Sequence, residues 1–189
     1  LGEYRVVLNQ QDDGTSGNNL SRLRSSPATI EQTTFANPTG SLTINRGNAA
    51  DNLTVESLPD LDAALVLGSS ANPFSSVTFA GAVTLSAGKS LTAEANGTIA
   101  LVNAGSDLAT SGSGQISFTT SRNISLASGS SITTADGALS LSANQQLVSS
   151  TGNFRGIDIN NSTIGSSSGP IVLQGRGGTA SAQGVYLHG

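Results

Sequence analysis

The stretch that decides the fold is residues 83–141, VTLSAGKSLTAEANGTIALVNAGSDLATSGSGQISFTTSRNISLASGSSITTADGALSL. It consists of short segments in which apolar and small polar residues alternate, as they do in a β-strand with one buried face. The apolar residues that lead these segments follow one another at steps of seven to nine residues, a spacing that no helix produces. They are Val83, Leu91, Ile99, Leu108, Ile116, Ile124, Ile132, Leu139 and Leu147. We predict short strands, with six of these residues pointing inward: Leu91, Ile99, Ile116, Ile124, Ile132 and Leu139.

Turn-forming residues separate the strands. Ala87-Gly88, Asn96-Gly97, Gly112-Ser113-Gly114, Ser128-Gly129 and Asp136-Gly137 contain residues that tolerate a positive φ and turn the chain sharply. Two closures are compatible with this pattern. In an antiparallel meander, Asn96-Gly97 and Asp136-Gly137 would form hairpins, whereas in a parallel coil they would be corners.

The parallel coil is favoured by the residues that point outward from the predicted strands. Thr84, Ala100, Ser117, Ser125 and Ser140 are small enough to stack directly between successive turns. Three sides of this length give a coil of about 24 residues, stacked ~4.8 Å apart by the β ladder. Residues 83–92 also align with residues 124–133, at an offset of 41 positions. The sequence therefore predicts an all-β fold, a parallel β-helix (solenoid) with roughly three short strands per coil.

The N-terminal part of the chain has a different pattern. Residues 4–8 and 20–24 read as two strands around the turn Asp12-Asp13-Gly14, while the segment from Asn9 to Pro38 is mostly polar. We predict that residues 1–40 hold N-terminal strands and a polar loop, acting as a cap or a flanking hairpin. Residues 41–189 are predicted to form a single continuous domain of β-helix repeats. The chain lacks an initiator Met, and we read it as a fragment of a longer chain.

Composition excludes several classes of function. Charged residues make up 11% of the chain and the net charge is −4, so the basic surface that nucleic acid requires is missing. The sequence contains no Cys, which excludes disulfides and Cys-ligated metal sites. No apolar run approaches the ~20 residues that cross a bilayer. We expect no nucleic-acid partner and no membrane insertion by this segment.

Three groups of residues resemble the repeats of giant bacterial surface proteins related to filamentous haemagglutinin. They are residues 41–55, residues 82–88 with 137–143, and the tail from Gly156 to Leu187. The resemblance implies a secreted, right-handed parallel β-helix at the bacterial cell surface, serving as a stalk or an adhesive fibre. It also implies as partners the neighbouring repeats of the same chain, and a host or neighbouring cell surface, matrix or glycan. The Asn-Pro signatures of that family's amino-terminal secretion domain are missing, because Asn37-Pro38 is isolated. An internal or carboxy-terminal stretch is therefore indicated.

One segment is similar to a metal-binding motif. Residues 47–53, GNAADNL, share features with the nonapeptide of calcium-binding β-rolls, in which an Asp supplies carboxylate oxygens to calcium. Such sites need consecutive stacked copies, whereas here there is one copy with Ala49 in a glycine position. Asp51 is thus a weak calcium candidate, and a plain polar corner is the simpler interpretation. We expect no cofactor and folding that does not depend on calcium.

Two further patterns contain residue types used in catalysis but lack the sequence context that catalysis needs. Residues 165–169, GSSSG, match a nucleophile elbow with Ser167 at its centre, but a strand follows where the elbow needs a helix. His188 is the single histidine of the chain, and its place next to the last residue favours a surface position over a catalytic base.

Two kinds of binding site are also not supported by the sequence. Ranks of outward threonines, which ice binding would use, are absent. Residues 175–178, GRGG, lack the following helix of a phosphate loop.

An enzymatic function would depend on the carboxylates of the chain, since many parallel β-helices act on polysaccharides with acids and bases that project from one side. The pairs Asp12/Asp13 and Asp60/Asp62 lie in turn-like sequence, where aspartate bonds its own backbone. Asp158 lies on an outward strand face with Arg155 as its basic neighbour. The sequence favours a non-catalytic structural stalk, scaffold or adhesive segment. The alternatives left open are a polysaccharide lyase or hydrolase and a calcium-binding repeat module.

Overall fold

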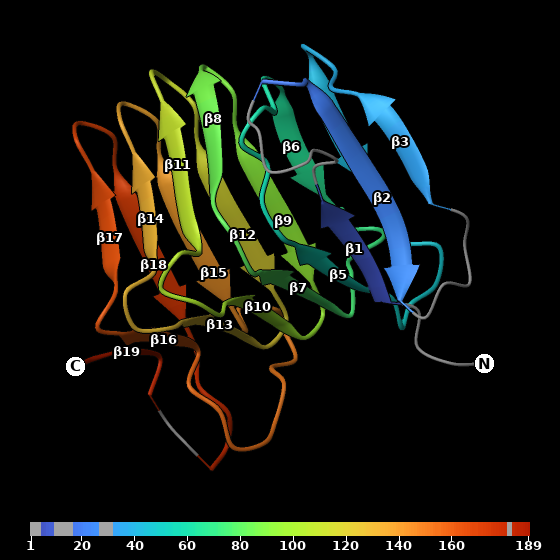
Figure 1. Cartoon of the computed structure of the whole chain (residues 1–189). Coiled ribbons are helices and arrows are strands. Elements are labelled where there is room, and N and C mark those ends of the chain that lie inside the picture. The colour runs from blue at the N-terminus through green and yellow to red at the C-terminus, as the bar shows by residue number, and fades with distance from the viewer. Residues whose placement is uncertain (1–4, 10–16, 27–31, 181–182) are drawn as a thin grey trace.

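A computed structural model describes residues 5–9, 17–26, 32–180 and 183–189. These residues form nineteen β-strands and no helix, so none of them belongs to a helix that could span a bilayer. The strands make three sheets that run side by side along one axis (Figure 1). The prediction of an all-β parallel solenoid with three strands per coil is confirmed.

Two sheets are purely parallel. Sheet B has the order β18 (Ile171–Gly175), β15 (Leu139–Ala143), β12 (Ile116–Thr120), β9 (Leu91–Ala95), β6 (Ala64–Leu67) and β4 (Ser41–Ile44), one strand from each of six successive turns. Sheet C has the order β17 (Thr163–Ser166), β14 (Ser131–Thr134), β11 (Asp107–Ser111) and β8 (Val83–Ala87).

Sheet A contains the N-terminal hairpin as well as solenoid strands. Its order is β19 (Val185–His188), β16 (Ile157–Asn160), β13 (Asn123–Leu126), β10 (Thr98–Leu101), β7 (Ser76–Phe79), β5 (Asn52–Val55), β1 (Arg5–Asn9), β2 (Leu20–Ser26) and β3 (Thr33–Ala36). Strand β1 pairs in parallel with β5, whereas β2 is antiparallel to both β1 and β3. The predicted turn at residues 12–14 lies outside the described residues. The division at residue 40 stays a prediction; the first strand of sheet B begins at Ser41.

The coil is right-handed. In Figure 1 the chain rises along sheet C at the front, crosses over the top, descends along sheet B at the back and returns along sheet A at the bottom, while it advances from right to left. This is the handedness expected of parallel crossovers between right-twisted strands.

The repeat length agrees with the prediction in most turns. Leu91 pairs with Ile116, 25 residues later, and Ile116 pairs with Leu139, 23 residues later. Leu139 pairs with Ile171, 32 residues later, because a long loop follows β15. The offset of 41 positions is not a stacking register: Val83 lies in sheet C and Ile124 in sheet A. The two segments resemble each other because every side of the coil is made of a short strand and a corner.

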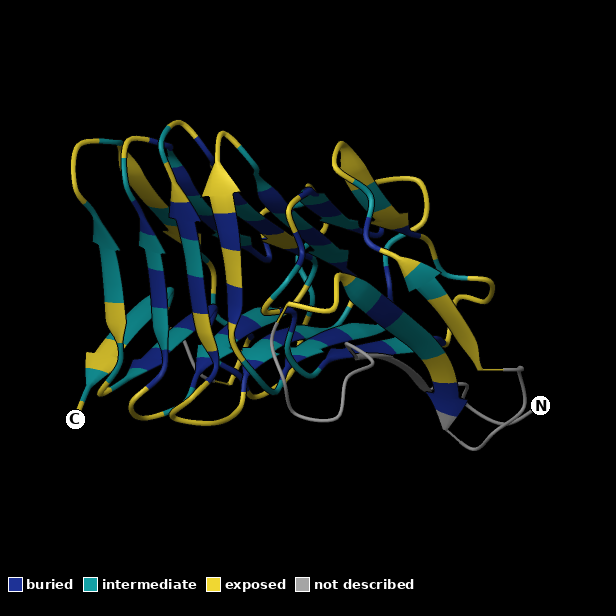
Figure 2. Cartoon of the chain, turned by 45° about the horizontal axis from the view of Figure 1, so that its top comes forward, coloured by how far each residue is buried: buried dark blue, intermediate teal, exposed yellow. Residues whose placement is uncertain are grey.

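The core runs along the axis, between the inner faces of the three sheets (Figure 2). All six predicted inward residues are buried, each at most 1% exposed: Leu91, Ile99, Ile116, Ile124, Ile132 and Leu139. The rings of Phe79 and Phe118 stack within this core, with centroids 5.4 Å apart. Leu147, the last residue of the spacing series, does not continue this inward row. This residue is 99% exposed, because the chain leaves the coil after β15.

The corners are made by close backbone approach between turns. A Cβ atom on Gly114 would lie 2.3 Å from the carbonyl oxygen of Lys89, and one on Gly137 would lie 1.9 Å from that of Gly114. Buried hydroxyls complete these corners: Thr110 Oγ1 donates to Gly114 O over 2.7 Å, and Thr134 Oγ1 donates to Gly137 O over 2.8 Å. Asp136-Gly137 joins strands of two different sheets, as Asn96-Gly97 does, so the hairpin alternative is wrong.

Candidate functional site

Asp51, the calcium candidate, shapes a corner before β5. Its Oδ2 accepts hydrogen bonds from the backbone N–H groups of Gly47 and Asn48, both over 2.8 Å, and the residue is 5% exposed. Its buried Oδ1 accepts no hydrogen bond from a described residue. Calcium takes six to eight oxygen ligands, and no group of three or more Asp, Glu or His side chains in the described part could hold a metal ion. The geometry therefore fits a turn cap better than a calcium cage.

Ser167 lies in a corner between two strands, β17 and β18, so the elbow geometry of a hydrolase is missing there. Its backbone N–H donates to the carbonyl groups of Thr134 and Ala135 on the preceding turn, over 3.1 Å in each case. These bonds tie the corner of residues 165–169 to the preceding turn of the stack.

Asp60 and Asp62, which were expected to bond their own backbone, accept hydrogen bonds from segments that are distant in sequence. Asp60 Oδ2 accepts a hydrogen bond from the backbone N–H of Gly17 over 2.7 Å. Asp62 accepts one from the hydroxyl of Ser86, on the next turn. The same contact recurs where Ser131 donates to Asp107 and Ser168 donates to Asp136, each over 2.6 Å. Asp12 and Asp13 lie outside the described residues.

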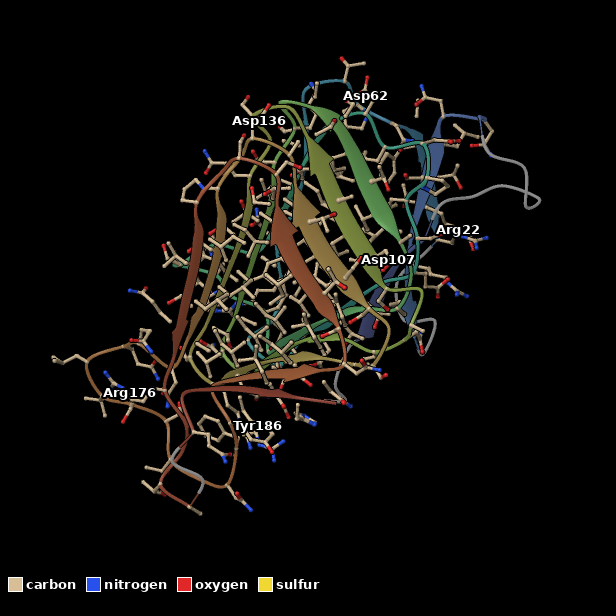
Figure 3. The ribbon with its side chains drawn as sticks, turned by 90° about the vertical axis from the view of Figure 1, so that its left-hand side faces the viewer. Arg22, Asp62, Asp107, Asp136, Arg176 and Tyr186 are labelled. Carbon is tan, nitrogen blue, oxygen red and sulfur yellow. The ribbon has the colours of Figure 1, made fainter. Side chains whose placement is uncertain are left out.

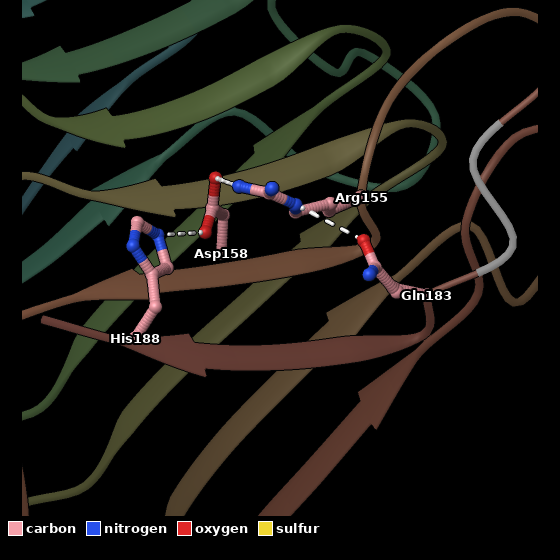
Figure 4. Close-up of polar contacts among 4 residues, drawn as sticks. All are labelled: Arg155, Asp158, Gln183 and His188. Atoms are coloured by element: carbon pink, nitrogen blue, oxygen red, sulfur yellow. Dashed lines mark hydrogen bonds and ion pairs between the residues drawn. The ribbon is translucent and has the colours of Figure 1, made fainter.

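The most chemically varied cluster surrounds Asp158, on the outer face of sheet A (Figure 4). Asp158 Oδ2 accepts from Arg155 Nη1 over 3.0 Å, which confirms Arg155 as its basic neighbour. Its Oδ1 lies 2.9 Å from Nε2 of His188, on the adjacent strand β19. The three side chains are 34% (Arg155), 27% (Asp158) and 33% (His188) exposed, so each remains accessible. Sequence reasoning placed His188 at the surface but did not bring it to Asp158, because 30 residues separate the two.

The cluster extends beyond these three side chains. Arg155 Nε donates to Gln183 Oε1 over 3.1 Å, and the Arg155 guanidinium lies 3.9 Å from the centroid of the Tyr186 ring. The rings of Tyr186 and His188 are 4.8 Å apart. Asp158 thereby ties β16 to β19 and to the loop that precedes β19. The arrangement supplies one carboxylate, one imidazole and one guanidinium on a single face.

A second feature is the loop of residues 144–156, which produces the longer turn. Asn144 begins the loop, with φ of +59° and no exposed surface. Its amide nitrogen donates to the carbonyl groups of Ser150, Arg176 and Gly177, over 3.2 to 3.4 Å. Its Oδ1 accepts from the backbone N–H of Ser150 over 2.7 Å and from Gln146 Nε2 over 2.9 Å. One buried amide thus closes the loop on itself and on the following turn.

A second loop, after β18, packs against the first. The backbone N–H of Gly178 donates to Phe154 O over 2.9 Å, and that of Ala180 donates to Gly152 O over 3.2 Å. We name residues 144–156 together with residues 176–180 the overhang. Both loops project below β16 and β19 in Figure 1, and Arg176 marks this corner in Figure 3.

The overhang presents two large apolar side chains to solvent. Leu147 is 99% exposed and Val148 is 82% exposed, whereas the inward residues of the coil are buried. Val148 also lines a groove of about 770 Å³ between the overhang and the solenoid, together with Arg122. Arg122 lies over the ring of Phe154 at 5.1 Å, and Arg176 Nη1 donates to Gln146 O over 3.4 Å. Sequence reasoning missed the overhang, although the eight-residue period ends at Leu147 and a polar run, Asn144-Gln145-Gln146, precedes that residue.

Comparison with known proteins adds no relative. No protein-family model matches the chain, and neither a curated protein nor a solved structure matches it significantly.

Proposed function

We propose that this chain is a structural scaffold or adhesive segment of a large secreted bacterial surface protein, and that it has no catalytic role. The observation that carries the proposal is the continuous apolar core, whose inward positions are filled by stacked residues from one turn to the next. Leu65, Leu91, Ile116 and Leu139 form one such row in sheet B, and each is at most 1% exposed. A stack of this kind gains length and stiffness with each added turn.

The outer surface supports a role that depends on shape and display. One outward row of sheet B carries small, uncharged residues: Thr92, Ser117 and Ser140. The corners are short in most turns, whereas the overhang interrupts the coil with a braced loop that exposes two apolar side chains. A regular stalk that carries one elaborated loop suits a protein that holds a contact surface away from its anchor.

Secretion and a place at the cell surface follow from the resemblance to filamentous haemagglutinin-type repeats. Under this proposal the partners are neighbouring repeats of the same protein, and a cell surface, matrix or glycan that the protein contacts. The test is labelling of intact cells of the source organism with an antibody raised against this chain. We expect surface labelling without permeabilisation, while an antibody against a cytoplasmic protein gives none. Labelling that requires permeabilisation would contradict the proposal.

The Asp158 cluster favours action on a polysaccharide as the second candidate function, because it places an acid, an imidazole and a guanidinium on one face. Glycoside hydrolysis uses a pair of carboxylates, and this cluster holds a single one. The deciding experiment is an assay of the purified chain against a panel of acidic and neutral polysaccharides, with Asp158→Asn as the matched variant. New reducing ends or unsaturated products that disappear in Asp158→Asn would replace the scaffold proposal with the enzymatic one.

A further inference from the structure

Two complementary surfaces lie at opposite corners of the solenoid. The first is the knob, which we define as the exposed residues Leu147 and Val148 of the overhang with Arg122 and Arg176 beside them. Among the described residues, neither Arg122 nor Arg176 forms an ion pair with a carboxylate, whereas Arg24 and Arg155 do. The knob is therefore an exposed apolar pair flanked by positive charge.

The second surface is a pocket of about 270 Å³ at the corner before β6 and at the end of β8. Its apolar wall consists of Pro59, Leu61 and Leu85, and its rim contains Asp60 and Asp62. Asp62 is exposed and forms an ion pair with no described side chain. We name this site the acidic pocket. Its apolar wall matches the apolar side chains of the knob, and its negative rim is opposite in charge to the arginines of the knob.

The two surfaces cannot meet within one molecule. Figure 3 shows Asp62 at the top of the solenoid and Arg176 at the bottom, on opposite sides of the coil. Residues 144 and 176, at the two bases of the overhang, are tied together by the Asn144 amide, so the overhang is held at this corner of the coil. A partner that carries the acidic pocket must therefore be a separate molecule.

We propose that the knob of one copy of this chain docks into the acidic pocket of a second copy. This deepens the proposed adhesive function, on which it rests, by naming a partner. The two surfaces differ, so the contact is heterologous: each molecule keeps a free knob and a free acidic pocket, and the association continues as an open chain. Leu147 would enter the apolar wall while Arg176 approaches the carboxylate of Asp62. A polar rim around a small apolar centre is the usual anatomy of a protein contact.

A lipid surface is the competing partner, since exposed apolar loops with flanking cations also bind anionic membranes. The second copy is favoured because the same chain carries the acidic pocket. This pocket offers an apolar surface to Leu147 and Val148 and a negative charge to the two arginines of the knob. The contact is small, and small interfaces are weak between isolated molecules. Repetition along parallel fibres on a surface multiplies such a contact by avidity.

The test uses two variants that each lose one half of the contact. The double variant Leu147→Ser/Val148→Ser removes the apolar side chains of the knob. The variant Thr84→Arg places a long cation over the acidic pocket, because Thr84 is an exposed residue of the pocket lining. Sedimentation velocity over a wide concentration range should show that the wild type self-associates and that each variant stays monomeric. An equimolar mixture of the two variants should form dimers and nothing larger, because one intact knob meets one intact pocket. Higher salt should weaken the association.

Controls separate this contact from others. Circular dichroism must show that both variants keep the wild-type β signal. Val102→Ser, at an exposed position outside both surfaces, should associate like the wild type.

Two results would overturn the inference. Association that survives in both variants but is lost in Leu187→Ser would place the contact at β19. A monomeric wild type would overturn it too, and if that monomer binds phosphatidylserine vesicles through Leu147, the partner is a lipid surface. Surface labelling of cells would be unaffected by either result, so the proposed function is judged separately.

Discussion

Ile116 pairs with Leu139 of the next turn, and neither side chain has any exposed surface. The contact is repeated on both sides of the pair, because Ile116 also pairs with Leu91 and Leu139 with Ile171. An inward residue of an interior turn is thus covered by the turn before it and by the turn after it. Stability in such a stack comes from nearest-neighbour contacts between turns. Damage to one inward position should therefore affect several turns.

The inward position of Ile124 gives the first prediction. Ile124→Asp places a charge where the side chain is fully buried between β10 and β16, and an unpaired buried charge is strongly unfavourable. We expect the variant to lose its β signal in circular dichroism, whereas Ile124→Val should cost only about 0.5–1.5 kcal/mol. Ser117→Asp, on the outer face of β12, is the control and should melt near the wild type. An Ile124→Asp protein with the wild-type melting temperature would refute the assigned inner face of β13.

The corner glycines give the second prediction. Gly137→Ala forces a Cβ atom to within 1.9 Å of the Gly114 carbonyl oxygen, so the two turns must move apart. We expect a lower melting temperature and a lower urea midpoint. Gly105→Ala is the matched control, because no atom lies within 4 Å of its Cβ position and its φ is not positive. That substitution should be neutral or stabilise the protein by about 0.4–1 kcal/mol. Equal effects of the two substitutions would show that the corners do not depend on close stacking.

The bracing of the overhang gives the third prediction. Asn144→Gly keeps the positive φ of this residue accessible and removes the amide, which makes hydrogen bonds to Ser150, Arg176 and Gly177. Loss of buried hydrogen bonds costs about 1–3 kcal/mol for each group left unpaired. We expect faster hydrogen exchange and faster proteolysis in residues 145–156, with the coil unchanged. Ser149→Ala is the control within the same loop. Unchanged exchange in Asn144→Gly would mean that the loop is ordered without this brace.

Asp51 gives the fourth prediction. Its carboxylate accepts two backbone N–H groups, and hydrogen bonds to a charged group contribute about 1.5–3 kcal/mol. Asp51→Ala should therefore lower the urea midpoint of unfolding by the same amount with and without a calcium chelator. The wild type should keep its circular dichroism spectrum and its urea midpoint when chelator is added. A midpoint that falls on chelation in the wild type, but not in Asp51→Ala, would establish a calcium site at this corner.

Part of the candidate site could be predicted from the sequence. The alternation Ile157-Asp158-Ile159 places Asp158 outward from its own strand, and Arg155 is close enough in sequence to reach it. The contact with His188 depends on which strand stacks on β16, and this is set by the length of the intervening turn. The knob was missed for a similar reason: the spacing of eight residues continues from Leu139 to Leu147, whereas the chain had already left the coil at Asn144.

The sequence by itself determined the local elements of this protein: short strands, their inner and outer faces, and corners at glycine and asparagine. These follow from the alternation of side chains along a strand and from the backbone freedom of single residues, which are properties of neighbours in the chain. Only the tertiary structure decided which strands stack, how long each turn is and that Leu147 lies in solvent. The physical reason is that the parallel ladders between turns of the solenoid, from β4 to β19, join residues 22 to 33 positions apart, so their register depends on every loop between them.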